Sequence, residues 1–227
     1  MPGVGVLAML LFVSSIPAIA VCMWFRIARY PFSLPRFSIV LLAGAVSFFP
    51  ALLLQNALTA ESGFFSVMGK WSLIAEIFVR IAFTEEFSRL LILVILFFVV
   101  RRFDSMRQPG VNAAISADTM AGAAGLIAGL GFAILESAVY GASNPANALL
   151  RTFTAAPLHG ACGFRVGSSV ALIREHPVQA VFRFLTAVII HGIYNFMLLI
   201  PGVFPSIAAI LIALSAFVSS IAAIRNG

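Results

Sequence analysis

Nine ionisable side chains of this sequence lie inside runs of apolar residues. The chain has only eight acidic residues, and four of them fall in such runs. If the runs cross a lipid bilayer, a charge at its centre costs about 2.5–3.5 kcal/mol on insertion scales, so each group needs a partner or a water-filled cavity. By default such groups indicate a functional site. They are Glu76, Arg80, Glu85, Glu86, Arg89, Glu136, His159, Arg165 and His191.

The densest group is the segment TEEFSR, residues 84–89. Arg89 comes four residues after Glu85 and three after Glu86, so on a helix it neighbours both carboxylates. One arginine neutralises one carboxylate, and the other then lies beside a like charge in a low dielectric, a setting that suits a general acid or base. The segment therefore predicts either a catalytic carboxylate or a structural ion pair that joins two helices.

Glu136 and Tyr140 form a second candidate group, in the stretch that begins at Gly131-Phe132. A lone glutamate in a membrane helix is an ion or proton site, a metal ligand or a hydrogen-bonded contact between helices. Tyr140 follows one turn later. We expect it to be either a hydrogen-bond partner of Glu136 or an anchor at the membrane interface.

Two histidines complete the candidate set. A lone histidine on an apolar helix is more often a core residue with a satisfied hydrogen bond than a ligand, but His159 and His191 are each followed by a glycine. A glycine lets another backbone or a substrate approach closely. Asn195 lies one turn after His191 and presents a donor on the same helix face.

The composition determines which elements must position these residues. The chain has 227 residues, of which 62% are hydrophobic and 10% charged, and its mean hydropathy is +1.09. Soluble domains carry about 25% charged residues. A chain with hydrocarbon as its solvent must pair its backbone polar groups internally, as helices or a closed barrel, and the long non-alternating apolar runs favour helices.

We therefore expect an all-α, polytopic transmembrane helix bundle that forms a single integral membrane domain over residues 1–227. About seven spans are predicted. The third span begins near residue 72 or near residue 81. The candidate spans cover residues 4–25, 37–58, 72–100, 117–141, 150–173, 180–200 and 205–224.

The basic residues predict the orientation of these spans, because loops on the cytoplasmic side carry an excess of Lys and Arg. In the seven-span arrangement nine arginines fall on one side, and the other side has Lys70, Arg151 and Arg80. The N-terminus is then outside and the C-terminus inside. The nine are Arg26, Arg29, Arg36, Arg101, Arg102, Arg107, Arg174, Arg183 and Arg225.

The candidate residues also share a depth. At about 1.5 Å per residue, and with the third span beginning at residue 81, each one projects to the outer half of the bilayer or near its midplane, although the helices run in alternating directions. Unrelated structural charges need not share a level. This convergence is typical of a hydrolytic site, and it involves Glu85, Glu86, Glu136, His159, His191 and Asn195.

Over residues 80–200 the chain resembles the PrsW family of intramembrane proteases, which is related to bacterial CPBP proteins and to type II CAAX prenyl endopeptidases. The resemblance rests on an ordered set of motifs on successive hydrophobic helices. One departure is Arg89, since a lysine is common there in the family and the two side chains differ in donor geometry. The motifs are Glu85-Glu86 with Arg89, Gly131-Phe132 with Glu136 and Tyr140, His159 with Gly163, and His191 with Asn195.

The resemblance implies peptide-bond hydrolysis of a membrane-anchored protein, similar to a site-1 protease that cuts an anti-sigma factor near its extracytoplasmic side. A glutamate of the pair 85–86 would activate water, and His159, His191 and Asn195 would hold that water and stabilise the oxyanion. Arg89, Glu136 and Tyr140 would support them. Alternatively, a metal such as zinc would be bound by His159, His191 and Glu136.

Other functions stay open at this point. A CAAX-type endopeptidase would act at the opposite face of the membrane. A proton- or ion-coupled transporter also needs intramembrane carboxylates, but no internal repeat is visible. In a non-catalytic scaffold the charges would only join helices. The expected location is the bacterial inner membrane, and no basic soluble segment is long enough to bind nucleic acid.

Overall fold

The structure is a computed structural model that describes residues 3–58, 71–99 and 116–226 of the chain. Every regular element in these ranges is a helix, which confirms the all-α prediction. The elements are α1 (Val4–Ile27), α2 (Leu34–Val46), α3 (Phe48–Ala57), α5 (Ser72–Ala75), the π-helical η3 (Glu76–Phe83), α6 (Thr84–Val99), α7 (Ala117–Gly141), α8 (Pro145–Phe153), α9 (Ala155–Leu172), α10 (Pro177–Leu199) and α11 (Val203–Asn226).

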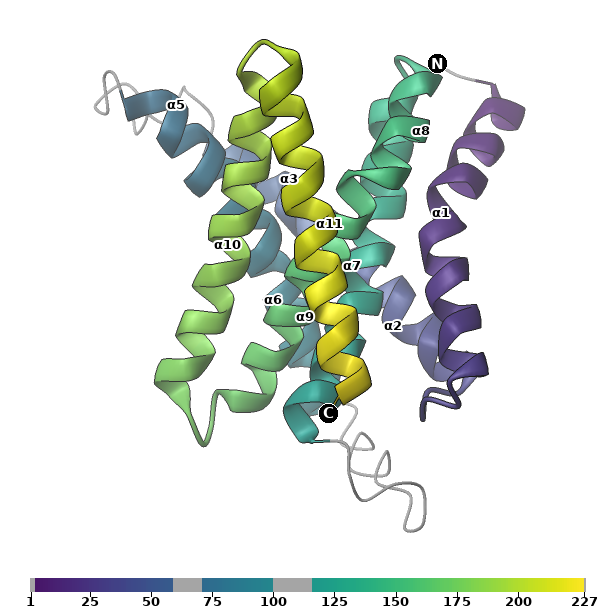
Figure 1. The fold of residues 1–227 in the computed structure, drawn as a ribbon, viewed down its shortest axis with the longest axis vertical. Coiled ribbons are helices and arrows are strands. Elements are labelled where there is room, and N and C mark those ends of the chain that lie inside the picture. Colours follow the sequence, from purple (N-terminus) through teal and green to yellow (C-terminus); the bar gives the residue numbers. More distant parts are fainter. Residues whose placement is uncertain (1–2, 59–70, 100–115, 227) are drawn as a thin grey trace.

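The helices run roughly along one axis, with α7 at the centre (Figure 1). Helix α7 packs against α9, α2, α1 and α8. We call the end that holds α8 and the α10–α11 turn, residues 200–202, the upper end. The lower end holds the α1–α2 turn, residues 28–33, and the α9–α10 turn, residues 173–176.

Five helical segments are long and apolar enough to cross a membrane. They confirm that the chain is built from membrane-spanning helices. Two more predicted spans correspond to the helical run 72–99 and to α9, which are outside this set of five. The basic residues Lys70, Arg101, Arg102 and Arg107, which entered the predicted orientation, lie outside the described residues. The five segments are Val4–Ile27, Leu34–Ala57, Ala117–Gly141, Pro177–Leu199 and Val203–Asn226.

Prolines explain two interruptions that the predicted spans did not contain. Helix α2 ends before Ser47 and α3 begins at once, because Pro50 in its first turn has no N–H for the preceding turn. The predicted span 150–173 is likewise divided at Thr154, three residues before Pro157, so that α9 begins only at Ala155. The third span has its helical start at Ser72, the earlier of the two expected positions.

Glycines bring α7 and α9 into backbone contact. A Cβ added at Gly125 would lie 2.0 Å from the carbonyl oxygen of Gly163, and one added at Gly129 would lie 1.9 Å from the carbonyl oxygen of His159. Real Cβ atoms do not approach so closely, so these positions accept only glycine at this helix separation. The contact is typical of membrane helices, in which small residues allow close packing, and it fixes His159 relative to α7.

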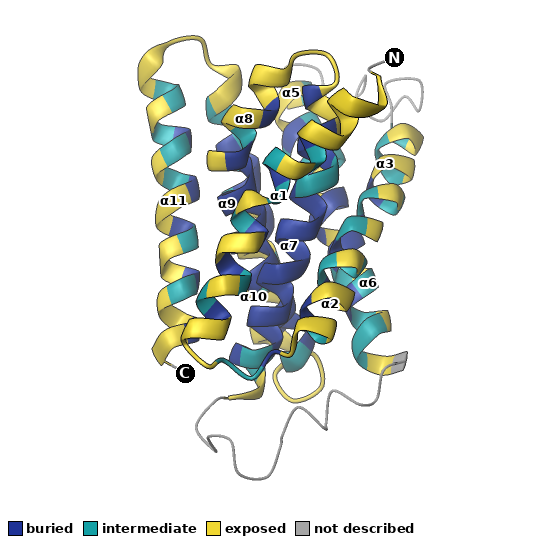
Figure 2. Ribbon diagram, turned by 90° about the vertical axis from the view of Figure 1, so that its right-hand side faces the viewer, coloured by how far each residue is buried: buried dark blue, intermediate teal, exposed yellow. Residues whose placement is uncertain are grey.

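Burial follows the distance from α7. The residues of α7 are mostly buried, whereas the outer faces of the surrounding helices are exposed (Figure 2). These exposed faces carry large apolar side chains such as Phe12, Leu53, Phe182 and Leu211. A soluble protein rarely exposes so much contiguous apolar surface, so these faces are lipid-facing.

The π-helical segment η3 immediately precedes the carboxylate pair of α6. Its close neighbour is α10, where the ring of Phe78 occupies the space beside Gly192, and a Cβ added there would lie 2.3 Å from ring atoms. The glycine after His191 therefore makes room for an aromatic ring. The glycine after His159 does the same for Phe217, whose ring would lie 3.0 Å from a Cβ at Gly160. π-Helical turns occur frequently at functional sites.

Candidate active site

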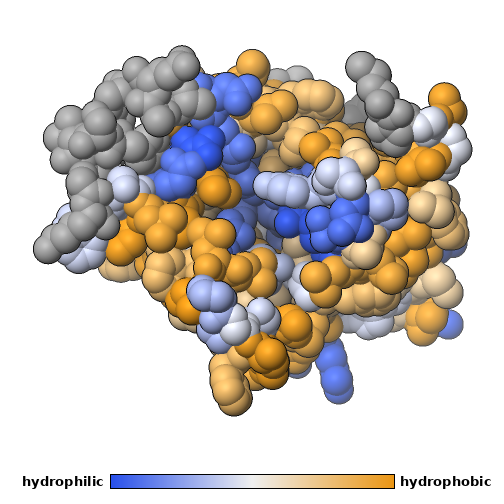
Figure 3. All heavy atoms as spheres, turned by 90° about the horizontal axis from the view of Figure 1, so that it is seen from above, coloured by the Kyte–Doolittle hydropathy of each residue, from blue (hydrophilic) through white to orange (hydrophobic). Residues whose placement is uncertain are grey.

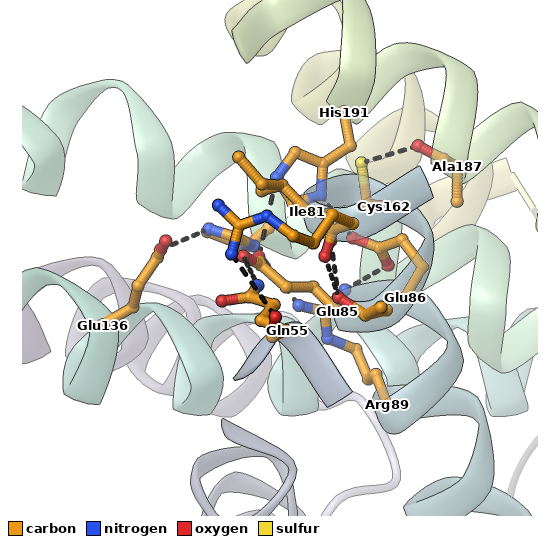
Figure 4. Close-up of polar contacts among 12 residues, drawn as sticks. Gln55, Ile81, Glu85, Glu86, Arg89, Glu136, Cys162, Ala187 and His191 are labelled. Atoms are coloured by element: carbon orange, nitrogen blue, oxygen red, sulfur yellow. Dashed lines mark hydrogen bonds and ion pairs between the residues drawn. The ribbon is translucent and has the colours of Figure 1, made fainter. Parts of the chain in front are cut away.

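Most of the candidate residues predicted from the sequence converge in one buried cluster (Figure 4). Helix α6 supplies Glu85 and Glu86, α9 supplies His159 and α10 supplies His191. Each of these four side chains is at most 5% exposed. Helices from distant parts of the sequence therefore place several ionisable groups within contact distance in the interior.

Glu86 is fully occupied by two partners. Its Oε2 forms an ion pair with the guanidinium of Arg89, and its Oε1 lies 2.8 Å from Nδ1 of His191. The carboxylate can only accept when it is ionised, so Nδ1 of His191 carries the proton and donates it to Glu86. Glu86 therefore orients His191 and leaves Nε2 of that ring as an acceptor.

Glu85 differs from Glu86 because one of its oxygens is free. Its Oε1 accepts a hydrogen bond from Nε2 of Gln55 at 2.9 Å, whereas its Oε2 is buried and has no hydrogen-bond partner among the described residues. That oxygen lies 3.6 Å from Nε2 of His191. A buried polar atom without a partner calls for an explanation, and a catalytic role and a bound water or ion are among those that apply.

His159 is held at both ring nitrogens. Nη2 of Arg89 lies 3.2 Å from its Nδ1, and Oε2 of Glu136 lies 2.7 Å from its Nε2. Arginine has no acceptor, so Nδ1 accepts and the proton is on Nε2, which donates to Glu136. Its ring centroid is 5.0 Å from that of His191. The ring of Phe132 packs against both His159 and the Arg89 guanidinium.

Glu136 connects this cluster to the upper end. Its Oε2 also accepts from Nη2 of Arg151 on α8 at 2.5 Å. The guanidinium of Arg151 lies over the ring of Tyr140, 4.3 Å from the centroid. Tyr140 therefore contacts Glu136 indirectly, through Arg151.

Two members of the site were not predicted from the sequence. Gln55 was absent from the candidates because a glutamine in an apolar span is uncharged and gives a weak signal. Arg151 was assigned only to the outer charges of the topology. Only their positions in the sequence could have indicated them. Gln55 and Arg151 both lie near the ends of predicted spans on the outer side of the membrane, where the other candidates were predicted to meet.

Asn195 is the predicted site residue that stands apart. Its side chain is half-buried on α10, and the described part of the chain offers it no hydrogen-bond partner. Glu76 and Arg80 pair with each other through the η3 turn, and Nη1 of Arg80 also reaches the carbonyl oxygen of Gln55 at 3.4 Å. This ion pair lies next to Gln55 and outside the buried cluster.

Three of the buried groups have donor atoms placed for a metal ion. One ligand atom each of Glu85, His159 and His191 lies within 4.8 Å of the other two. The free Oε2 of Glu85 and the acceptor Nε2 of His191 fit this role without change. The Glu86 carboxylate behind His191 is the outer partner that metal-bound histidines usually have. Ligation through His159 would displace Arg89 or Glu136 from one of its nitrogens.

The cluster lies toward the upper end of the molecule. Gln55 is two residues from the end of α3 there, about 3 Å along the helix axis. Seen from above, hydrophilic side chains gather around a hollow in a face that is otherwise largely apolar (Figure 3). Water from this side has the shorter route to Glu85.

A helical membrane bundle with buried carboxylates, histidines and a potential metal site has the groups that an intramembrane hydrolase needs. The comparisons with known proteins agree with this class. The family model of the PrsW family intramembrane metalloproteases matches residues 35–224, and the chain belongs to that family. The search of curated proteins and the search of solved structures each found no significant match.

Proposed function

We propose that the protein is a membrane endopeptidase that uses Glu85 as its general base and cuts a single-span membrane protein near its extracytoplasmic boundary. Family membership supports the protease class. The observation that carries the residue assignment is the free Oε2 of Glu85, since Glu86 is occupied by Arg89 and His191.

In this proposal each side chain has a defined task. Glu85 removes a proton from the attacking water and later gives it to the leaving amine, while Gln55 holds its other oxygen. His191, oriented by Glu86, stands beside the reacting atoms. Asn195 has a free amide that would donate to the oxyanion as it forms.

We further propose a metal at this site. His159 and His191 would hold it. With Glu136 as the carboxylate ligand, as the sequence suggested, Glu85 keeps its role as general base; with Glu85 as the ligand, its free Oε2 would be taken by the metal and Glu85 would no longer be the base. Zinc fits nitrogen and oxygen ligands of this kind. When bound, it would polarise the scissile carbonyl and lower the pKa of a bound water. If the metal displaced Glu136 or Arg89 from His159, Glu136 would keep its ion pair with Arg151, and Arg89 would keep its ion pair with Glu86.

The proposed arrangement in the membrane has seven spans. It adds the run 72–99 and α9 to the five segments that are long and apolar enough. The lower end carries most of the described arginines, so the positive-inside rule makes it cytoplasmic, with the N-terminus outside. The proposed location is the bacterial inner membrane. The described arginines of the lower end are Arg26, Arg29, Arg36, Arg174, Arg183 and Arg225.

The side of cleavage follows from the position of the cluster. A substrate helix keeps its carbonyls hydrogen-bonded, so the scissile bond must lie in unwound chain. Unwinding is easiest at the end of a span, where water satisfies the freed groups. Since Gln55 and Arg151 place Glu85 and Glu136 near the upper end, the cut falls at or just outside the extracytoplasmic boundary, as in a site-1 cut of an anti-sigma factor.

Co-expression with candidate single-span proteins tests this proposal. The wild type should give a product whose new terminus, once sequenced, lies at the extracytoplasmic boundary, and Glu85→Gln should abolish it. A terminus on the cytoplasmic side would indicate a CAAX-type reaction and contradict the proposed side. Cleavage that survives Glu85→Gln would contradict the base assignment. A scaffold or transporter would produce no cleavage that depends on this chain.

A further inference from the structure

The guanidinium of Arg151 uses only part of its hydrogen-bonding capacity. An arginine side chain has N–H donors on all three of its nitrogens. Nη2 of Arg151 donates to Oε2 of Glu136 at 2.5 Å, whereas Nε is buried without a hydrogen-bond partner. The described residues offer Nη1 no acceptor either. Donors without acceptors are costly where water is scarce, so Arg151 is prepared for a further acceptor.

The side chain of Arg151 is held in place while these donors stay free. Its guanidinium lies over the ring of Tyr140, 4.3 Å from the centroid, and Glu136 holds Nη2. The side chain of Arg151 is 19% exposed and Tyr140 is 52% exposed, so the pair can be reached from outside the bundle. A donor that is oriented in advance loses little freedom when it binds.

Arg151 lies directly beside the candidate active site. Nε2 of His159 donates to the same oxygen of Glu136 at 2.7 Å, so a single oxygen atom separates the two side chains. A ligand atom of His159 lies within 4.8 Å of one of Glu85. An extended chain advances about 3.3 Å per residue, so a substrate cut at Glu85 passes Arg151 within about three residues of the scissile bond.

The order of the helices places this contact on one side of the cut. Arg151 is in α8 at the upper end, and α9 runs from there toward the lower end and carries His159 (Figure 1). Arg151 therefore lies above His159. The part of a substrate that meets it is the part on the upper side of the scissile bond, which is the extracytoplasmic side in the proposed orientation.

The local charge balance selects a neutral acceptor. Arg151 and Glu136 already form an ion pair, so the pair as a whole attracts a second carboxylate weakly, and the charge of Glu136 repels it. A backbone carbonyl accepts a hydrogen bond without bringing a net charge. A membrane helix that unwinds frees such carbonyls, and each of them is costly in the bilayer until a donor reaches it.

We propose that Arg151 is a substrate-binding residue whose Nη1 donates to a backbone carbonyl of the unwound substrate, on the extracytoplasmic side of the scissile bond. This role, which rests on the proposed endopeptidase function, makes unwound main chain the feature that the site recognises. A carbonyl within a helix already has its partner, so the contact favours the unwound form over the helical one.

The test combines a variant of Arg151 with a substrate whose carbonyls are weakened one at a time. Arg151→Lys keeps a positive charge for Glu136 but has a single nitrogen and so lacks the second donor group. The substrate is a synthetic peptide that covers the span of a protein cleaved by the wild type. Single amides outside the cut are replaced by esters, because an ester carbonyl is a weaker acceptor than an amide carbonyl.

The purified full chain is assayed in detergent with each peptide. With the all-amide peptide, Arg151→Lys should lower kcat/KM about 10- to 100-fold, mainly by raising KM. At one position the ester should lower kcat/KM of the wild type about 3- to 10-fold and leave that of Arg151→Lys unchanged. A purely structural role of Arg151 would give the same ester effect in both proteins.

Two further variants serve as comparisons. Arg174→Lys is the matched control, because the guanidinium of Arg174 also lies over a ring, 4.7 Å from the centroid of Phe98, but at the lower end. It should keep the wild-type kcat/KM and the ester effect. Tyr140→Leu keeps Arg151 and removes the ring that orients it. It should lower kcat/KM about 2- to 5-fold and reduce the ester effect, and it decides the test if Arg151→Lys is unstable.

The possible results are distinct. The proposal is wrong if no ester position distinguishes the wild type from Arg151→Lys and Tyr140→Leu. It is also wrong if the loss in Arg151→Lys disappears once the acidic residues of the peptide are replaced by their amides, since the ligand would then be a side-chain carboxylate. A wild type that cleaves no single-span protein would instead contradict the proposed function, and this role of Arg151 with it.

Discussion

Glu85 and Glu86 are adjacent in sequence but have different roles in the structure. We predict that Glu85→Gln lowers turnover by at least about 10²-fold, the usual contribution of a general base, with little change in stability. Glu86→Gln should also be inactive, but it removes the charge that pairs with Arg89 and His191. Breaking a buried ion pair costs about 3–5 kcal/mol. Turnover measured together with thermal unfolding separates the two variants.

Each of these two variants serves as the control for the other, because both remove one carboxylate charge at neighbouring positions of α6. Equal destabilisation of the two proteins would mean that Glu85 is as structurally engaged as Glu86. Full activity of Glu85→Gln in a stable protein would remove Glu85 from the reaction and leave the free oxygen of that side chain without a role.

Gln55 is predicted to position Glu85. Gln55→Leu removes the hydrogen bond to Oε1, and a bond to a charged group contributes about 1.5–3 kcal/mol. We expect kcat to fall about 10- to 100-fold while KM changes little, because the substrate does not need Gln55 for binding. Asn56→Leu is the matched control, since this amide is adjacent but exposed. Equal losses in both variants would indicate a general effect on α3.

Metal content distinguishes the two proposed ligand sets. Purified wild-type protein should carry about one zinc ion per chain, and a chelator should remove both metal and activity. His191→Ala should abolish binding. If Glu85 is the carboxylate ligand, Glu85→Gln loses metal and Glu136→Gln retains it, and the reverse holds if Glu136 is the ligand. Metal-free protein with full activity would leave a metal-independent Glu/His mechanism.

The charged members of the site could be predicted from the sequence because burying them is costly. A glutamate, arginine or histidine in an apolar run requires an explanation, so His159 and Glu136 could be singled out and placed at one depth. Their pairing could not be predicted. The contact between Arg151 and Glu136 depends on α8 folding back along α7, and Gln55 meets Glu85 only through the packing of α3 on α6.

At the level of elements, the glycine contact between α7 and α9 is the feature most sensitive to substitution. Gly125→Ala would place a Cβ 2.0 Å from the carbonyl oxygen of Gly163, so the helices must separate. We predict a loss of about 1–3 kcal/mol of stability, as for an overpacked core, with loss of activity as His159 moves away from Glu136. Thermal unfolding and the cleavage assay measure both effects.

Gly5→Ala serves as the comparison for this prediction. No atom lies within 4 Å of a Cβ at Gly5 in α1, so the same substitution there meets open space. It should be neutral or raise stability by about 0.5–1 kcal/mol, because alanine favours the helix. A Gly125→Ala protein as stable and active as Gly5→Ala would show that the close helix approach is not required.

Helix boundaries show where sequence patterns lose precision. Hydropathy places the apolar segments well, because lipid requires long uninterrupted apolar surface. It does not detect Thr154 as a break, since both flanking helices are apolar enough to join into one predicted span. The breaks come from missing backbone donors at Pro50 and Pro157, which depend on where each proline falls within its helix.

For the whole molecule, the topology is the testable quantity. Reporter fusions after Tyr30, Glu175 and Asn226 should report the cytoplasm, because these positions lie at the arginine-rich lower end. Fusions after Ser143 and Gly202, at the upper end, should report the outside. A cytoplasmic signal from either of the last two would overturn the orientation and place the candidate active site on the opposite face.

The π-helical stretch Glu76–Phe83 has a consequence for how the length of this chain can vary. A π turn holds more residues than an α turn of the same reach. The stretch therefore has more residues than an α-helix of the same length needs. Loss of one residue there converts it toward an ordinary α-helix, while the helices before and after it keep their positions. The same deletion inside α6, which is already α-helical, cannot be absorbed in this way. It would turn everything beyond it by about 100° and shift it by about 1.5 Å. Tolerance to deletion should therefore be highest immediately beside the residues that tolerate substitution least.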